Sequence, residues 1–147
     1  MGGRNSGAAA TGGVEKTQGC MSGGITFDTA SLIGADRNDH RILALLARAR
    51  ERGMRVAIPA TALAQVIRNP ARQARPSRLI RQAGTDLIAL DGPDATAVGL
   101  LLARTGTADI ADAHVVVRAQ RARQAVATSD PTDLRRISAE LTQLVVV

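Results

Sequence analysis

Short aliphatic runs alternate with longer segments of helical periodicity, and this alternation constrains the fold more than any other feature of the 147-residue chain. Strands are predicted at 25–28, 55–58, 86–90, 125–128 and 143–147. Helices are predicted at 39–52, 61–68, 94–104, 109–123 and 131–141. An arginine-rich segment over 70–83 is expected to break and restart at Pro76. Strands alternating with helices favour a parallel sheet with helices on both faces, so we predict an α/β fold of three layers, α/β/α.

The length of the chain leaves room for one domain. Residues 1–24 are rich in Gly, Ala, Ser and Thr and are predicted to form a disordered tail, with the domain at 25–147 and with Met1 and Met21 both possible starts. Cys20 is the single cysteine, which favours a reducing compartment. Without a signal peptide or a membrane-spanning run in the sequence, we expect a cytoplasmic protein.

The chain is basic and nearly free of aromatic residues. It has 19 basic and 13 acidic residues, a net charge of +6, and Lys16 is its only lysine. This balance favours a polyanionic partner. Phe27 is the only aromatic residue, so the core must be aliphatic, and the lack of rings argues against base stacking on aromatic platforms.

Aspartates lie where predicted strands end and helices begin. Asp28 ends the first strand, Asp130 follows the fourth with Asp133 one turn later, and Asp109 and Asp112 open a helix on one face. If the two strands are neighbours, the five carboxylates converge on one edge of the sheet. Clustered carboxylates repel one another, a cost that a cation offsets, and oxygen ligands select Mg²⁺ or Mn²⁺. Such ions are the usual means of hydrolysing phosphodiesters.

Structural roles compete with this interpretation at several positions. Asp130 before Pro131 suits a helix N-cap, and Asp109 suits a helix dipole, whereas Asp28 has no obvious structural role. His114 is a possible metal ligand but is expected to be a packed or solvated histidine. The other aspartates are predicted to be ordinary loop and cap residues: Asp36, Asp39, Asp86, Asp91 and Asp94.

Three motifs, in this order and spacing, resemble those of PIN domains. The segment 25–33, Ile-Thr-Phe-Asp-Thr-Ala-Ser-Leu-Ile, resembles the opening of such a domain. Residues 109–114, Asp-Ile-Ala-Asp-Ala-His, resemble its third acidic motif, and 126–134, Val-Ala-Thr-Ser-Asp-Pro-Thr-Asp-Leu, its fourth. The resemblance covers about Ile25 to Leu141, and in its compact size the chain is similar to the VapC toxins of bacterial toxin–antitoxin pairs.

The resemblance implies a PIN-like three-layer fold and an endoribonuclease that uses Mg²⁺ or Mn²⁺. It implies that Asp28, Asp112 and Asp130 are catalytic and hold the metal, with Asp109 and Asp133 as further acidic ligands. Thr29, Thr128 and Ser129 would support the site. The implied partners are an RNA substrate, a cognate antitoxin and a second copy of the chain in a homodimer.

One position departs from the family pattern. The family often has a glutamate in the helix after the second strand, where this chain has Gln65. A carboxamide offers an oxygen but no charge, so we expect weaker metal binding. A binding module that grips RNA or a protein without cutting is therefore the alternative. A phosphoacceptor domain is disfavoured, because Lys16 lies in the predicted tail.

Arginines follow the Gln65 helix. They are candidates for phosphate contacts along a substrate groove, for contact with the antitoxin, or for a solvated helix face. The set is Arg68, Arg72, Arg75, Arg78 and Arg81.

Overall fold

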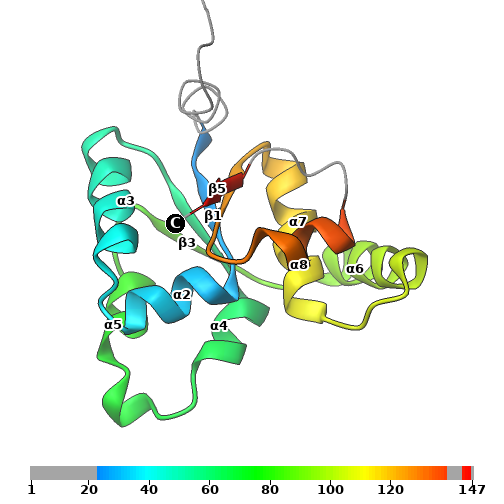
Figure 1. Ribbon diagram of the computed structural model, residues 1–147, viewed down its shortest axis with the longest axis horizontal. Coiled ribbons are helices and arrows are strands. Elements are labelled where there is room, and N and C mark those ends of the chain that lie inside the picture. Colours follow the sequence, from blue (N-terminus) through cyan, green and yellow to red (C-terminus); the bar gives the residue numbers. More distant parts are fainter. Residues whose placement is uncertain (1–22, 139–143, 147) are drawn as a thin grey trace, which may run out of the picture.

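A computed structural model describes residues 23–138 and 144–146 of the chain (Figure 1). The strands are β1 (Ile25–Phe27), β2 (Val56–Pro59), β3 (Thr85–Ile88), β4 (Ala125–Thr128) and β5 (Leu144–Val146). The helices are α2 (Thr29–Asp36), α3 (His40–Glu51), α4 (Ala60–Val66), η2 (Pro70–Arg72), α5 (Ala74–Leu79), α6 (Gly92–Thr105), α7 (Ile110–Ala122) and α8 (Pro131–Ile137). The predicted tail, with Cys20 and both possible starts, lies outside the described residues except for Gly23 and Gly24.

The five strands form one parallel sheet in the order β3-β2-β1-β4-β5. Helices α2, α3 and α5 lie on one face and α6, α7 and α8 on the other (Figure 1). This arrangement confirms the predicted fold class, a PIN-like three-layer α/β/α fold with a central parallel sheet. The direction of the connections reverses between β1 and β4, and in such sheets ligands bind outside the carboxyl ends of the strands at this reversal.

The core is aliphatic around one ring, as the composition requires. Phe27 is fully buried on β1, flanked by the buried valines and alanines of β4 and α7. Because both faces of the sheet are covered, β1, β2 and β4 are buried along their whole length instead of alternating.

At Gly24 the backbone approaches the Arg55 carbonyl so closely that a residue with a Cβ would not fit. Its φ is +130°, and a Cβ at this position would lie 2.5 Å from the Arg55 carbonyl oxygen. The next residue donates its N–H to the same carbonyl, Ile25 N to Arg55 O, at 2.9 Å. The chain therefore enters β1 pressed against the start of β2.

Three element predictions were wrong. Helix α2 was not predicted, although Asp28 caps it. The break in the arginine-rich segment falls at Gln73, between η2 and α5, while Pro76 sits in the first turn of α5, where its missing N–H costs no hydrogen bond. Helix α8 ends at Ile137, with Ser138 extended, and the rest of the predicted helix lies largely outside the described residues. None of the helices in the described ranges is long and apolar enough to cross a membrane.

Candidate metal and nucleic-acid site

Asp28 lies directly after β1 and is the N-cap of α2. Its Oδ1 accepts a hydrogen bond from the Ser31 backbone N–H at 2.8 Å, and its side chain is buried, with 4% of the residue exposed. Ser31 in turn donates its hydroxyl to the Ala127 carbonyl at 2.5 Å, which ties α2 to β4. Asp28 therefore has the structural role that the sequence analysis did not find for it, and one carboxylate oxygen remains beyond this cap.

Asp130 follows β4 after Ser129 but does not cap α8 in the expected way. It occupies the N-cap position, yet its side chain makes no capping hydrogen bond. Instead its backbone N–H donates to the buried Thr128 hydroxyl at 2.9 Å. Because β1 and β4 pair directly, with Phe27 opposite Ala127, Asp28 and Thr128 follow side by side. The Asp130 carboxylate and the neighbouring Ser129 are exposed at this edge.

Asp109 and Asp112 form the N-terminal turn of α7. Asp109 is the N-cap, and its Oδ1 accepts a hydrogen bond from the Asp112 N–H at 2.9 Å, so it has a structural role at the start of this helix. Helix α7 packs against β1, β2 and β4, which brings its first turn to the same edge of the sheet. Asp112 is half-buried there.

These four carboxylates and Asp133 form one group, because the negative charges of the other four all act on Asp112. The pKa of Asp112 is raised to about 6, first by burial and then by the negative charges of Asp109, Asp28, Asp133 and Asp130. The pKa of Asp28 is also raised, chiefly by burial, with hydrogen bonds from Thr128 and Ser31 opposing the shift.

The side chains do not form a closed coordination sphere. Within residues 23–138 and 144–146, no three His, Cys, Asp or Glu side chains are arranged closely enough to hold a metal ion. The donor set nevertheless suits a hard cation, because the carboxylates of Asp112 and Asp130 form no ion pair with any residue that the structure describes. Thr29 adds a buried hydroxyl without a hydrogen-bond partner among the described residues.

Gln65 and the arginines lie on the segment that follows β2. Helix α4 packs between α2 and α7, and Gln65 is exposed on it. Arg68 donates to the Ala64 and Ile67 carbonyls at the end of α4, and Arg75 donates to the Asp36 carbonyl. All five arginines of the set are exposed, so their roles in RNA binding stay predictions.

The sequence analysis missed the contribution of Gln73. Its Oε1 accepts hydrogen bonds from the N–H groups of Arg68 and Asn69, both at 2.7 Å, while its Nε2 donates to Val66 O and to Asp36 Oδ2. Four hydrogen bonds from one side chain hold the loop that carries the first arginines. Three of these bonds are to nearby residues of the same segment, and only the bond to Asp36 depends on where α2 lies.

Asp94 was wrongly predicted to be an ordinary cap. The residue is 4% exposed, and its carboxylate pairs with Arg121 and faces the buried ring of His114. His114 is fully buried, as expected for a packed histidine.

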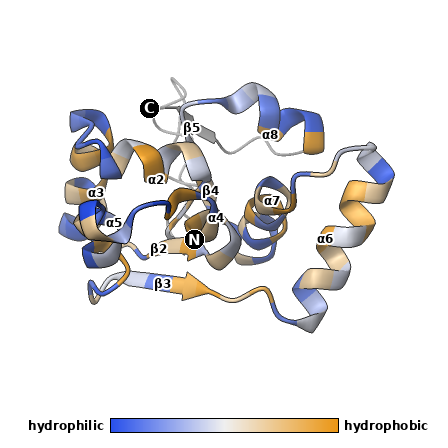
Figure 2. Ribbon diagram, turned by 90° about the horizontal axis from the view of Figure 1, so that it is seen from below, coloured by the Kyte–Doolittle hydropathy of each residue, from blue (hydrophilic) through white to orange (hydrophobic). Residues whose placement is uncertain are grey.

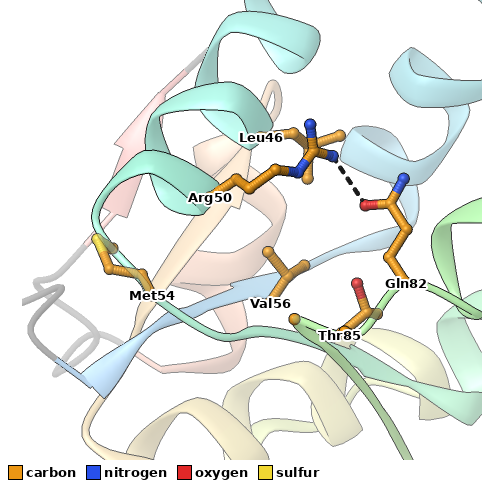
Figure 3. A pocket seen from close by; sticks show the side chains of 8 residues that line it. Leu46, Arg50, Met54, Val56, Gln82 and Thr85 are labelled. Atoms are coloured by element: carbon orange, nitrogen blue, oxygen red, sulfur yellow. Dashed lines mark hydrogen bonds between the residues drawn. The ribbon is translucent and has the colours of Figure 1, made fainter.

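A groove runs between α3 and α5, away from the acidic edge. One end is a cavity of about 480 Å³ with Leu46, Met54 and Val56 among its lining, and Arg50 donates to Gln82 at 2.9 Å across it (Figure 3). A second hollow of about 210 Å³ shares Leu46 and Gln82 with the first. Its other lining residues include Leu43, Leu79, Arg75 and Arg78.

A scan against models of known protein families finds no match to this chain, and a search of curated proteins finds none either. The PIN resemblance therefore rests on the motifs and stays a prediction, alongside a fold of the expected class.

Proposed function

We propose that the protein is a metal-dependent endoribonuclease, a VapC-like toxin that hydrolyses RNA phosphodiester bonds at the carboxyl edge of β1 and β4. The observation that best supports this is that Asp28, Asp112 and Asp130 come from three separate segments to the edge where the sheet reverses its connections. There the negative charges of Asp28 and Asp130 help to raise the pKa of Asp112. Structural needs explain Asp28 and Asp109 as caps, but they leave Asp112 and Asp130 unexplained.

The residues divide into binding and supporting roles. Asp28, Asp112 and Asp130 would hold one Mg²⁺ or Mn²⁺ ion, with Asp109 and Asp133 supporting it directly or through water. Thr128 orients the turn that carries Asp130, and Thr29 and Ser129 offer hydroxyls beside it. The ion would activate water and neutralise charge that builds on the scissile phosphate. The surrounding arginines would bind the RNA backbone, since aromatic stacking is not available.

The test is cleavage of a mixed RNA pool by the purified protein with Mg²⁺ or Mn²⁺. We expect cleavage by the wild type, abolished by chelation and reduced about a hundredfold or more by Asp112→Asn. The matched control is Asp39→Asn, which changes a partly exposed cap on α3 and should cleave normally. Wild-type protein that binds RNA but cleaves none with either ion would overturn the proposal.

The alternative function is an RNA- or protein-binding module without cleavage. It is supported by Gln65, which stands where the family pattern has an acid. On this alternative the wild type is inactive, and Gln65→Glu creates cleavage that it lacks. Cleavage by the wild type that Asp28→Asn stops would exclude the binding module.

The partner we propose for the α3–α5 groove is the antitoxin, through an acidic amphipathic segment. The groove has an apolar floor of Leu43, Leu46 and Leu79. Around it, Arg50 and Arg78 make no ion pair within the described part of the chain. An acidic partner matches these charges, and leucine-sized side chains match the floor.

A further inference from the structure

His114 lies two residues after Asp112, yet its ring nitrogens face Thr61 and Asp94 and not the acidic group. The ring is fully buried, and both of its nitrogens meet protein groups. Nδ1 lies 2.7 Å from the Thr61 hydroxyl on α4, and Nε2 lies 3.6 Å from Asp94 Oδ2 on α6. Nδ1 is therefore engaged by Thr61, while Nε2 faces the Asp94 carboxylate without a hydrogen bond among the described residues.

The neighbours of the ring determine which nitrogen carries the proton. The Asp94 carboxylate accepts but cannot donate, so it favours the proton on Nε2. Nδ1 is then an acceptor, and the Thr61 hydroxyl donates to it. Arg121 pairs with the other oxygen of Asp94 and holds that carboxylate in place.

This chain of contacts ends on α4. Within the described ranges, Thr61 to His114 is the only side-chain hydrogen bond between α4 and α7. Thr61 is in the first turn of α4, and Gln65 is one turn later on the same face. Helix α4 is only seven residues long and has no side-chain cap at its N-terminus, so its own hydrogen bonds hold it weakly.

We propose that His114 is a positioning residue of the acidic site, which through Thr61 fixes the face of α4 that carries Gln65 against the turn of α7 that carries Asp112. The inference rests on the proposed function, because it assigns Gln65 a place beside the metal. It explains why a fully buried histidine, hydrogen-bonded to Thr61 and facing Asp94, directly follows the acidic turn.

The test uses Gln65→Glu as a reporter of where α4 lies, with Mn²⁺ affinity measured by calorimetry on the full chain. A carboxylate beside the site should raise Mn²⁺ affinity about tenfold. In a Thr61→Val background the valine keeps the shape but loses the hydroxyl, and we expect most of this gain to disappear. Thr61→Ser keeps the hydroxyl and should restore the gain.

Controls separate positioning from mere destabilisation. Thr96→Val removes an exposed hydroxyl on α6 and should leave the gain intact. If Thr61→Val does not fold, as judged by circular dichroism, Thr61→Ala serves in its place. An equal gain with and without the Thr61 hydroxyl overturns the inference, as does the absence of any gain in the wild-type background. The proposed function fails separately, if Asp112→Asn leaves wild-type Mn²⁺ binding unchanged.

Discussion

Asp112 is the residue of the acidic edge whose pKa burial and the neighbouring negative charges raise to about 6. Its carboxyl is half-buried and faces four other carboxylates. In the metal-free protein at pH 7 this charge destabilises the fold. We therefore predict that Asp112→Asn raises the free energy of unfolding by about 1–2 kcal/mol, a value reduced for partial solvent screening. Urea unfolding in chelator measures it.

The same shift sets a pH dependence. An ordinary aspartate in the unfolded chain has a pKa of 3.8, so between pH 6 and 4 the folded protein holds a proton that the unfolded chain does not. Through this group, stability rises as pH falls across that window, and below it both states are protonated. The advantage of Asp112→Asn should thus shrink towards zero near pH 4. An advantage that is constant with pH would contradict the assignment.

Gly24 is a position where one added methyl group should be costly. With φ at +130° and the Arg55 carbonyl oxygen 2.5 Å from a Cβ, Gly24→Ala should destabilise the protein by about 2 kcal/mol or more. The matched control is Gly99→Ala, at an exposed position of α6 where an added Cβ has nothing within 4 Å; this change should stabilise the protein by up to about 1 kcal/mol. Thermal unfolding of both variants makes the comparison, and equal effects would contradict it.

At the scale of elements, Gln73 fastens the loop between α4 and α5. Gln73→Ala removes four hydrogen bonds, so we expect a loss of about 1–3 kcal/mol and faster amide exchange at Arg68 and Asn69. Hydrogen–deuterium exchange measures this directly. Gln82→Ala, which loses one bond to an exposed arginine, is the control and should leave exchange at those amides unchanged.

Element predictions from the sequence succeeded where the pattern is local. Strand β4 was predicted at its observed bounds, because its three apolar residues and Thr128 are flanked by Gln124 and Ser129. Helix α2 was missed, since its eight residues include Gly34 and its cap doubles as a candidate site residue. The role of Asp94 could not be predicted, because its partners His114 and Arg121 lie on α7. The bond from Gln73 to Asp36 could not be predicted either, because Asp36 lies on α2.

At the scale of the whole molecule, the convergence of the acids could be predicted from one condition, that β1 and β4 are neighbours. The sheet meets that condition. What the sequence could not provide is which carboxylates fold locally into caps. Asp28 and Asp109 do so, while Asp130 was expected to cap and does not. Whether an aspartate caps its helix depends on the local backbone and not on residue type, since all three residues are aspartates.

We propose that a second copy of the chain covers the outer face of α6, in the homodimer that the resemblance implies. Leu100 is 67% exposed there, and no charged residue lies between Asp94 and Arg104 (Figure 2). In an antiparallel pair, the Arg104 end of one helix would meet the Asp91 end of the other. We predict that Leu100→Glu yields a monomer by light scattering, while Leu87→Glu, on exposed β3, stays dimeric. A wild-type monomer at high concentration would contradict this.

The most direct measurement of the central claim is Mn²⁺ binding to the full chain, with Asp112→Asn and Asp130→Asn beside Asp39→Asn. The account predicts that the wild type and Asp39→Asn bind Mn²⁺ equally and that each site variant loses at least about tenfold in affinity. Absence of wild-type binding, or site variants that bind as tightly as Asp39→Asn, would show that the acidic edge of β1 and β4 is not a metal site.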